Sequence, residues 1–235
     1  MTGLASSRVA ANLAAVRSRI DQACRQAGRD PASVRLLPVS KTHGPEMIEA
    51  AYDAGVRLLA ENRVQELVEK AERFADRPDL RWAVIGHLQS NKVRLAAELA
   101  AEVQTVDSVK TAHALDRRAS ELGRPLDVLL QVNSSNEVQK SGVTPEAVVA
   151  LAREVERCAA LRVRGLMTIA VFSTDRDRVA ACFQRMRQVQ EQLRQTDGLD
   201  ADYADLSMGM SGDFELAIEH GATTVRIGQA IFGAR

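Results

Sequence analysis

The sequence is poor in aromatic residues and carries no net charge. Its 235 residues include one Trp, two Tyr and five Phe, and 31 basic side chains balance 31 acidic ones. Stacking platforms for single-stranded nucleic acid need several aromatic rings, and non-specific binding to DNA needs a clustered basic face. The composition therefore argues against a nucleic-acid partner.

Cysteines are few, and signals for export or membrane insertion are lacking. Residues 1–5 show no basic region followed by a long apolar run, so they do not resemble a signal peptide. No apolar stretch approaches the roughly 20 residues that span a bilayer. Cys24, Cys158 and Cys182 are odd in number, far apart and outside any CxxC pair, which is typical of free thiols in a reducing compartment. We therefore expect a cytoplasmic protein without a membrane partner.

Short β-like runs alternate with longer helical patterns along most of the chain. An amphipathic stretch over 4–28 precedes them and predicts an N-terminal helix. The predicted strands are 34–40, 56–60, 81–86, 103–106, 126–133, 163–169, 203–207 and 223–227. The helical stretches lie near 45–54, 63–75, 90–100, 108–123, 144–159, 174–195 and 211–220. A helix after each strand indicates parallel βαβ units.

Two α/β architectures fit this alternation. A doubly wound sheet usually has fewer strands and often carries a GxGxxG turn after the first of them, and this sequence has no such turn. Eight β/α units in a chain of this length match a TIM barrel. We predict a single (βα)8 barrel domain over residues 1–235, with an extra N-terminal helix.

The ends of the last two strands carry residues suited to an anion. TIM barrels often bind phosphate with the loops after strands seven and eight. Ser211 lies where a helix is predicted to begin, so its hydroxyl and nearby backbone N–H groups are candidates to hold phosphate. Gly209, Gly212 and Gly228 allow the backbone to approach a ligand closely. The alternative is ordinary helix capping and turn chemistry.

Lys41 follows the first predicted strand. A lysine at such a position normally extends into water. The alternative is a partly desolvated amine that forms a Schiff base with a carbonyl. Together with a phosphate site, such an amine indicates a phosphorylated aldehyde or ketone. Pyridoxal 5′-phosphate fits this description, and so does the substrate of a sugar-phosphate aldolase.

Arg226 lies near the end of the eighth predicted strand, between Val225 and Ile227, so its side chain should point differently from both. One hypothesis is an ion pair with a neighbouring carboxylate. The other is a hydrogen bond to the ring nitrogen of pyridoxal phosphate. A permanently cationic arginine would disfavour protonation of that nitrogen.

Seven segments, in order along the chain, resemble the YggS/PROSC family of pyridoxal phosphate homeostasis proteins. They are VSKT at 39–42, ENRVQE at 61–66, IGHLQSNK at 85–92, KSG at 140–142, GLM at 165–167, LSMGMS at 206–211 and VRIGQAIFG at 225–233. The sequence departs from the family pattern at Ala60 and Arg63, where a GENY-type motif has Gly and Tyr, and at Ala83, where His is common.

The resemblance implies a barrel similar to the N-terminal domain of alanine racemase. It implies that Lys41 is the Schiff-base lysine, that Ser211 and the backbone around Gly228 hold the phosphate, and that Arg226 faces the pyridine nitrogen. Asn62 matches a family asparagine near the cofactor. The implied role is non-catalytic: to hold, deliver or buffer pyridoxal phosphate, with apo forms of pyridoxal phosphate enzymes as partners.

An amino-acid racemase is the alternative function. Racemases with this barrel add a β-domain that supplies a catalytic tyrosine in a dimer, and this sequence leaves no room for one before Arg235. Neither Tyr52 nor Tyr203 lies in an acid/base motif, and without a second proton donor racemisation should be poor. We therefore predict no catalytic residue. Separately, we expect a monomer. A Schiff-base aldolase is the third hypothesis.

The remaining candidates are one lysine and the histidines. Lys140, after the fifth predicted strand, is either a second amine for the aldehyde or a solvated loop lysine. His87, at the end of the third predicted strand, either lines the cofactor pocket or is structural. His43, His87, His113 and His220 show no metal-ligand spacing, so we expect no metal site.

Overall fold

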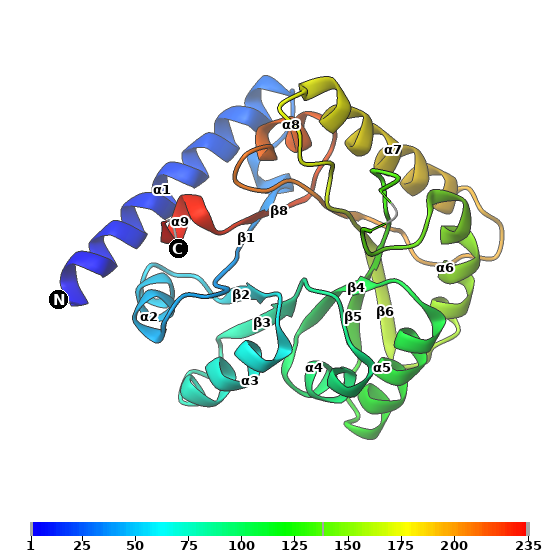
Figure 1. Ribbon diagram of the computed structural model, residues 1–235, viewed down its shortest axis with the longest axis horizontal. Coiled ribbons are helices and arrows are strands. Elements are labelled where there is room, and N and C mark those ends of the chain that lie inside the picture. Colours follow the sequence, from blue (N-terminus) through cyan, green and yellow to red (C-terminus); the bar gives the residue numbers. More distant parts are fainter. Residues whose placement is uncertain (1, 138, 234–235) are drawn as a thin grey trace.

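The computed structural model describes residues 2–137 and 139–233. Within them, eight parallel strands form one sheet in the order β1-β8-β7-β6-β5-β4-β3-β2, with the helices outside it (Figure 1). The strands are β1 Arg35–Pro38, β2 Leu58–Glu61, β3 Arg81–Val84, β4 Glu102–Val106, β5 Leu126–Gln131, β6 Leu161–Met167, β7 Asp205–Ser207 and β8 Thr224–Ile227. Each overlaps one predicted strand, and the (βα)8 barrel is confirmed.

The extra N-terminal helix is also confirmed. The α-helices are α1 Thr2–Gln26, α2 Pro45–Asp53, α3 Val64–Arg73, α4 Val93–Leu99, α5 Val109–Glu121, α6 Val148–Glu156, α7 Arg176–Arg194, α8 Phe214–Glu219 and α9 Gln229–Phe232. Short 3-10 turns cover Pro31–Ser33, Ser90–Lys92 and Pro145–Ala147.

Helix α1 packs beside α9 (Figure 1). Val9, Leu13, Val16 and Ile20 are spaced three or four residues apart, so they share one face, and all four are buried. The side-chain amide of Asn12 donates to the carbonyl of Ile231 on α9 at 2.8 Å. The first helix thus braces the last one.

Strands β1 and β2, at the two ends of the sheet order, meet through little backbone pairing. Strands β1 and β8, like β2 and β3, pair over four residues each. Strands β1 and β2 are joined just past the end of β1, by a single bridge between Val39 and Ala60, where Ser40 N donates to Ala60 O at 3.1 Å. This seam lies directly before Lys41.

The barrel interior has an apolar side and a polar side. Leu37, Val39, Ala60 and Ala83, from β1 to β3 and the end of β1, form their own buried cluster. On the other side lies a set of buried polar residues on β4, β5, β7 and β8: Glu102, Gln104, Gln131, Ser207 and Arg226. Since side chains alternate along a strand, both sets belong to the inward-facing positions.

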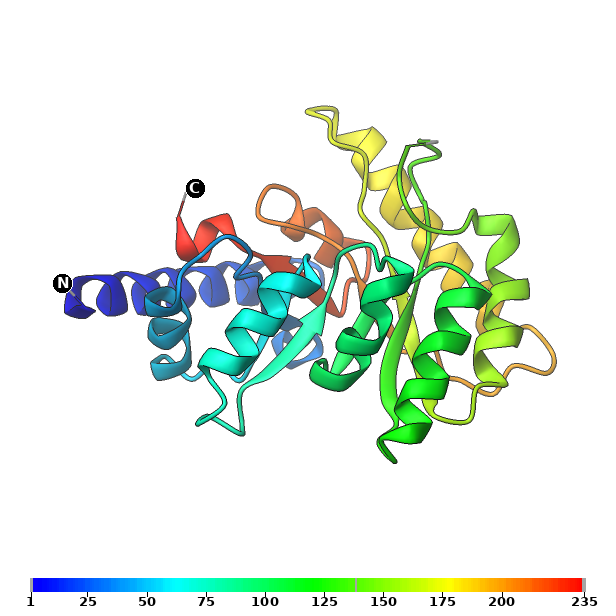
Figure 2. The ribbon, with the colours of Figure 1, turned by 60° about the horizontal axis from the view of Figure 1, so that its bottom comes forward.

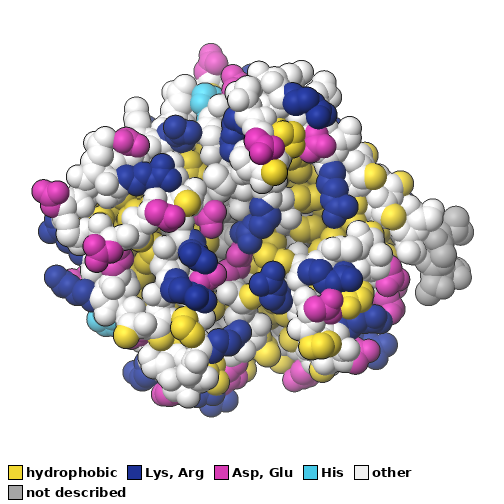
Figure 3. Space-filling model, turned by 180° about the vertical axis from the view of Figure 1, so that it is seen from behind, with side chains coloured by type: hydrophobic (Ala, Val, Ile, Leu, Met, Phe, Trp, Pro, Cys, Tyr) yellow, Lys and Arg dark blue, Asp and Glu magenta, His cyan; other side chains and the backbone are white. Residues whose placement is uncertain are grey.

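The outer surface mixes charges of both signs. Seen from behind, Lys and Arg are interspersed with Asp and Glu (Figure 3). Among the helices of the described chain, none combines the length and the apolar character needed to cross a membrane.

Candidate functional site

A cavity of about 520 Å³ opens at the carboxyl ends of the strands. The loops after β5, β6 and β7 rise on this side of the barrel (Figure 2). The cavity is lined by Val39, Lys41, Asn62, Ile85, Gly86, His87, Gln131, Lys140, Ser141, Ile169, Met210, Ser211, Gly212, Arg226, Gly228 and Gln229. Its size is within the usual range for a small-molecule site.

The structure brings together six of the seven predicted site residues. Those lining the cavity are Lys41, Asn62, His87, Ser211, Arg226 and Gly228. Gly209 is set back from it. Its φ is +94°, and a Cβ at this position would lie 2.6 Å from the Cβ of Ala217 on α8. This glycine is therefore needed for backbone conformation and close packing against α8, which accounts for it without any contact with a ligand.

The charged side chains that line the cavity all carry positive charge. Lys41, Lys140 and Arg226 contribute cations, and none of the described lining residues is an aspartate or glutamate. Cations facing one cavity attract anions and concentrate them there. The cavity is therefore suited to a ligand with a negative group such as phosphate.

A buried ion pair lies beneath the loop that presents Lys41. Lys70 Nζ donates to Glu61 Oε1 at 2.6 Å and to the carbonyl oxygen of Ser40 at 2.8 Å. The Ser40 hydroxyl donates to the same Glu61 oxygen at 2.6 Å. Burial raises the pKa of Glu61, while the hydrogen bonds from Lys70 and Ser40 act in the opposite direction. On the other side of Lys41, Thr42 N donates to Glu66 Oε2 at 2.8 Å.

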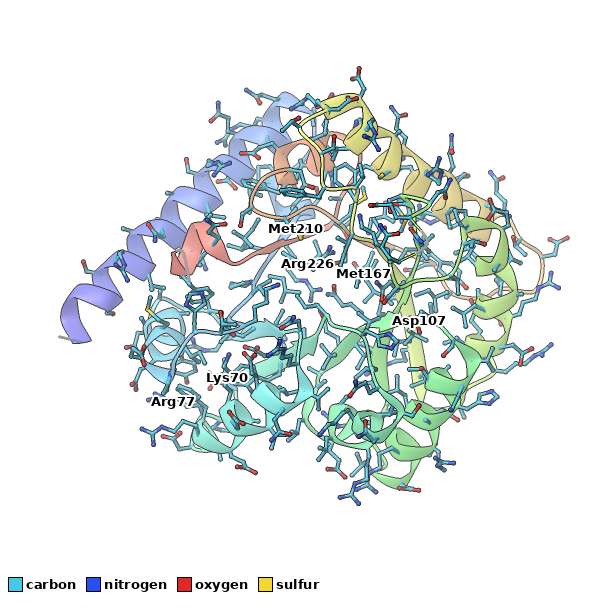
Figure 4. The ribbon with its side chains drawn as sticks, in the orientation of Figure 1. Lys70, Arg77, Asp107, Met167, Met210 and Arg226 are labelled. Carbon is cyan, nitrogen blue, oxygen red and sulfur yellow. The ribbon has the colours of Figure 1, made fainter. Side chains whose placement is uncertain are left out.

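Arg226 points into the barrel, near the centre of Figure 4. Val225 and Ile227 belong to the core between sheet and helices, so the predicted difference in direction is confirmed. The Arg226 side chain donates to Ser207 Oγ at 2.8 Å and to the carbonyl oxygen of Thr168 at 2.6 Å. Burial lowers the pKa of Arg226 to about 10, and the charge of Asp213 opposes this shift.

The hypothesis of an ion pair for Arg226 is wrong. The residue is 3% exposed, and within the described ranges no carboxylate oxygen lies within 4.0 Å of its guanidinium. Its charge is held by neutral acceptors, which leaves donor capacity for a ligand in the cavity.

The loop after β7 and the start of α9 face the same part of the cavity. Helix α8 begins at Phe214 after Asp213, so the expectation that Ser211 begins this helix is wrong. Asp213 Oδ1 instead accepts from Met210 N at 2.6 Å and closes a tight turn around Ser211 and Gly212. Gly228 precedes α9, and a Cβ there would lie 3.0 Å from the Val39 carbonyl oxygen. Within α9, Ile231 N and Phe232 N both donate to the Gly228 carbonyl oxygen at 2.9 Å, so only the N–H groups of Gln229 and Ala230, at the very start of the helix, lack an acceptor within it.

Asn62 and His87 line the wall formed by β2 and β3. A Cβ on Gly86 would lie 1.9 Å from the carbonyl oxygen of Asn62, so only glycine allows these two loops to pack as they do. His87 Nδ1 lies 3.5 Å from Asp107 Oδ2, and its side chain is 58% exposed. In the described part of the chain, no three His, Cys, Asp or Glu residues are grouped as metal ligands.

Lys140 is already well bound. Its Nζ donates to the carbonyl oxygen of Ala170 at 2.8 Å and lies 2.5 Å from Glu137 Oε2. The hydrogen bond from Lys140 is the main cause that lowers the pKa of Glu137. This lysine reaches the cavity as one half of an ion pair.

Sequence reasoning missed Gln131, a polar residue of the cavity lining. Gln131 lies at the end of β5, and its Oε1 is buried without a hydrogen-bond partner among the described residues. An unpaired buried polar atom is costly, so this atom fits a cavity that is completed by a polar group. Strand alternation could have placed it inward; nothing in the sequence shows that its oxygen stays unpaired.

Both tyrosines lie away from the cavity. Tyr203 donates its hydroxyl to Glu156 on α6. Tyr52 donates to Asp79 Oδ1 at 2.7 Å, and the guanidinium of Arg57 stacks 4.0 Å from its ring centre. Neither can reach a ligand in the cavity while it holds these partners.

Comparison with known proteins agrees with this geometry. Residues 11–235 match the family described as "Alanine racemase, N-terminal domain". The chain is 46% identical to the pyridoxal phosphate homeostasis protein of Pseudomonas aeruginosa, over 97% of this chain and 96% of that protein. Its fold is similar to PipY of Synechococcus elongatus with pyridoxal phosphate bound, with a TM-score of 0.84 and 37% identity over 96% of this chain and all of PipY. It also resembles the fold of alanine racemase from Streptomyces coelicolor, with a TM-score of 0.74 and 21% identity, over 98% of this chain and 59% of the racemase.

Proposed function

This chain belongs to the pyridoxal phosphate homeostasis proteins within the alanine racemase N-terminal domain family, and we propose that it holds pyridoxal 5′-phosphate as a Schiff base with Lys41. Residues 1–235 are proposed to act as one cofactor-binding barrel domain. One observation carries the proposal: an amine, a buried guanidinium and a glycine-rich backbone turn meet in one cavity whose described lining has no carboxylate.

Lys41 supplies the covalent attachment. Pyridoxal phosphate, when bound, provides an aldehyde that a lysine amine can mask. The Nζ of Lys41 would form the C=N bond to the aldehyde carbon, with release of one water molecule. The buried pair of Glu61 and Lys70 supports the loop from which Lys41 acts.

The other lining residues orient the cofactor. Ser211, Gly212 and the backbone from Gly228 into α9 are proposed to hold the phosphate, by hydroxyl and N–H donors at a helix start. Arg226 is proposed to face the ring nitrogen. With a pKa of about 10 it stays charged at neutral pH, so it would keep that nitrogen unprotonated. Asn62 and His87 complete the wall beside the ring.

The proposed role is to hold and buffer the cofactor without turnover. Two-base racemisation needs a base on one face of the substrate and a proton donor on the other, and both tyrosines of this chain are bound elsewhere. The relatives that match over nearly the whole length are named for homeostasis, as in Vibrio alginolyticus at 47% identity. In deuterium oxide, the loaded protein should therefore exchange the α-proton of alanine very slowly. Rapid exchange would establish the racemase alternative.

The decisive experiment is addition of pyridoxal phosphate to the purified protein, followed by the visible spectrum, borohydride reduction and peptide mapping. We expect a yellow protein with the label on Lys41, and no label at that site in Lys41→Ala. Lys140→Ala is the matched control, since it also removes an amine from the cavity lining. A label on another lysine in the wild type would reject Lys41, and a colourless wild type would favour the aldolase alternative.

The location, oligomeric state and partners of the protein are also part of the proposal. We propose that the protein is a cytoplasmic monomer and that apo forms of pyridoxal phosphate enzymes receive the cofactor from it. Mixing the loaded protein with an apo-enzyme should restore that enzyme's activity. If direct contact is needed, restoration will be faster than release of the cofactor into buffer.

A further inference from the structure

A chain of hydrogen-bonded side chains runs through the barrel behind Arg226. Arg226 Nη1 donates to Ser207 Oγ at 2.8 Å, and Ser207 donates to Gln104 Oε1 at 2.6 Å. Gln104 Nε2 donates to Glu102 Oε1 at 2.6 Å. Arg35 ends the chain with two bonds to the Glu102 carboxylate, at 2.9 and 3.0 Å. The chain links residues of β8, β7, β4 and β1 across the polar side of the interior.

From Arg226 to Glu102, each side chain donates its hydrogen bond to the next one along the chain. A carboxylate can only accept, so Gln104 must turn its NH2 group toward Glu102 and its oxygen toward Ser207. Ser207 then donates its single hydroxyl proton to Gln104, and its oxygen lone pairs are available to accept from Arg226. Glu102 therefore determines, through two neutral side chains, that Arg226 meets an acceptor.

Because these side chains are buried, one set of rotamers is strongly favoured over the others. Gln104 and Ser207 are fully buried, and Arg226 nearly so. Any rotamer that breaks the chain leaves a buried polar group unpaired, which destabilises that rotamer. The second acceptor of Arg226, the Thr168 carbonyl, is part of the backbone. Ser207 and Gln104 are thus the side chains that select the orientation of the guanidinium.

We propose that Gln104 is a positioning residue, which acts through Ser207 to hold the guanidinium of Arg226 toward the place of the cofactor's ring nitrogen. The identity of the ring rests on the proposed function. The restraint on Arg226 does not, because the hydrogen-bonded chain consists entirely of side chains of this protein.

The first test uses the protein without cofactor. Gln104→Leu removes both bonds at similar volume, and Gln190→Leu is the matched control. Gln190 is another buried glutamine, whose amide donates to the Tyr203 carbonyl on the far side of the sheet at 2.6 Å. Proton exchange at the Arg226 guanidinium is followed by 15N-resolved NMR, with Arg226→Lys to assign the signals. We expect exchange about tenfold faster in Gln104→Leu, the effect of roughly one lost hydrogen bond, and wild-type exchange in the control.

The second test uses the loaded protein. Gln104→Leu should keep the borohydride label on Lys41 but shift the pH midpoint of the visible band by about one unit, because one unit corresponds to about one hydrogen bond in free energy. A purely structural role would lower stability in both glutamine variants alike and leave the midpoint unchanged.

Ser207→Ala serves if Gln104→Leu does not fold, since it deletes only the hydroxyl and should produce the same faster exchange and shifted midpoint. Wild-type exchange and an unchanged midpoint in a folded variant would overturn the proposal. Failure to label Lys41 in the wild type would instead reject the proposed function, and the exchange measurement would still decide on Gln104.

Discussion

Lys70 donates a hydrogen bond to the backbone carbonyl of Ser40, the residue immediately before Lys41, at 2.8 Å. The same ammonium pairs with the buried carboxylate of Glu61 on β2. Lys70 therefore connects α3, β2 and the end of β1 at one point (Figure 4). The loop that presents Lys41 depends on a charge pair that has no role in the cavity itself.

We expect Lys70→Met to lower the free energy of unfolding at pH 7 by about 3–5 kcal/mol, because Glu61 is left buried without its partner. Burial raises the native pKa of Glu61, and the loss of Lys70 raises it further. A carboxyl with a raised native pKa is stabilising below its unfolded value, and that contribution is lost as the pH rises through the native pKa. Urea unfolding should show a smaller deficit near pH 5 than near pH 7. A deficit independent of pH would contradict this account, and adding Glu61→Gln to the variant should recover part of the loss.

Gly86→Ala should disturb the cavity wall. Its Cβ would lie 1.9 Å from the Asn62 carbonyl oxygen, so the backbone must move, at a cost of about 1–3 kcal/mol. Weaker binding of pyridoxal phosphate should accompany the loss of stability. Gly212→Ala is the control for stability, because no atom lies within 4 Å of its added Cβ. Equal denaturant midpoints for the two variants would refute the prediction.

Ser211→Ala should weaken binding of pyridoxal phosphate about tenfold or more, because hydrogen bonds to charged groups contribute about 1.5–3 kcal/mol. The dissociation constant can be read from the visible band. Ser120→Ala, on the exposed side of α5, should bind as the wild type does. If Ser211→Ala also binds normally, the phosphate lies elsewhere in the cavity.

Cys158 should react slowly with alkylating agents in the native protein. Its thiol is buried, and burial raises its pKa to about 11. Because the thiolate is the reactive form, the alkylation rate should keep rising past the ordinary thiol pKa of about 8.5. Mass spectrometry of peptides labelled across a pH series measures this. A plateau near the ordinary value would show that the site opens to solvent.

The fold could be predicted because eight short apolar runs, each followed by a helical pattern, indicate parallel βα units, and the number of units together with the missing GxGxxG turn favours a barrel over a doubly wound sheet. The ends of its strands then identified Lys41, Ser211 and Arg226 as residues of one edge. Other details were beyond this reasoning. Gly209 and Gly228 cannot be distinguished from the sequence alone. The structure shows that Gly209 packs against α8, the helix that follows it, and not against the cavity.

The interior network was equally hidden. Gln104 and Glu102 lie on β4, and their partner Ser207 lies on β7, about a hundred residues later in the chain. No local pattern relates positions so far apart. The same holds for Lys70. In the sequence it is one of several charged positions on an amphipathic helix, and only the tertiary structure shows that it pairs with Glu61.

The seam between β1 and β2 has a single backbone bridge, and the side chains of Ser40, Glu61 and Lys70 add hydrogen bonds across it. Neighbouring amides report on its two sides: Val39 N bonds to Ile227 on β8 at 2.8 Å, and Ser40 N bonds to Ala60 at 3.1 Å. Local opening begins where the fewest bonds must break, so the Ser40 amide should exchange with deuterium sooner than that of Val39. Lys41 therefore follows a seam that the Ser40 hydroxyl and the buried pair of Glu61 and Lys70 hold together. A charged pair of side chains does here what a ladder of backbone hydrogen bonds does between β5 and β6.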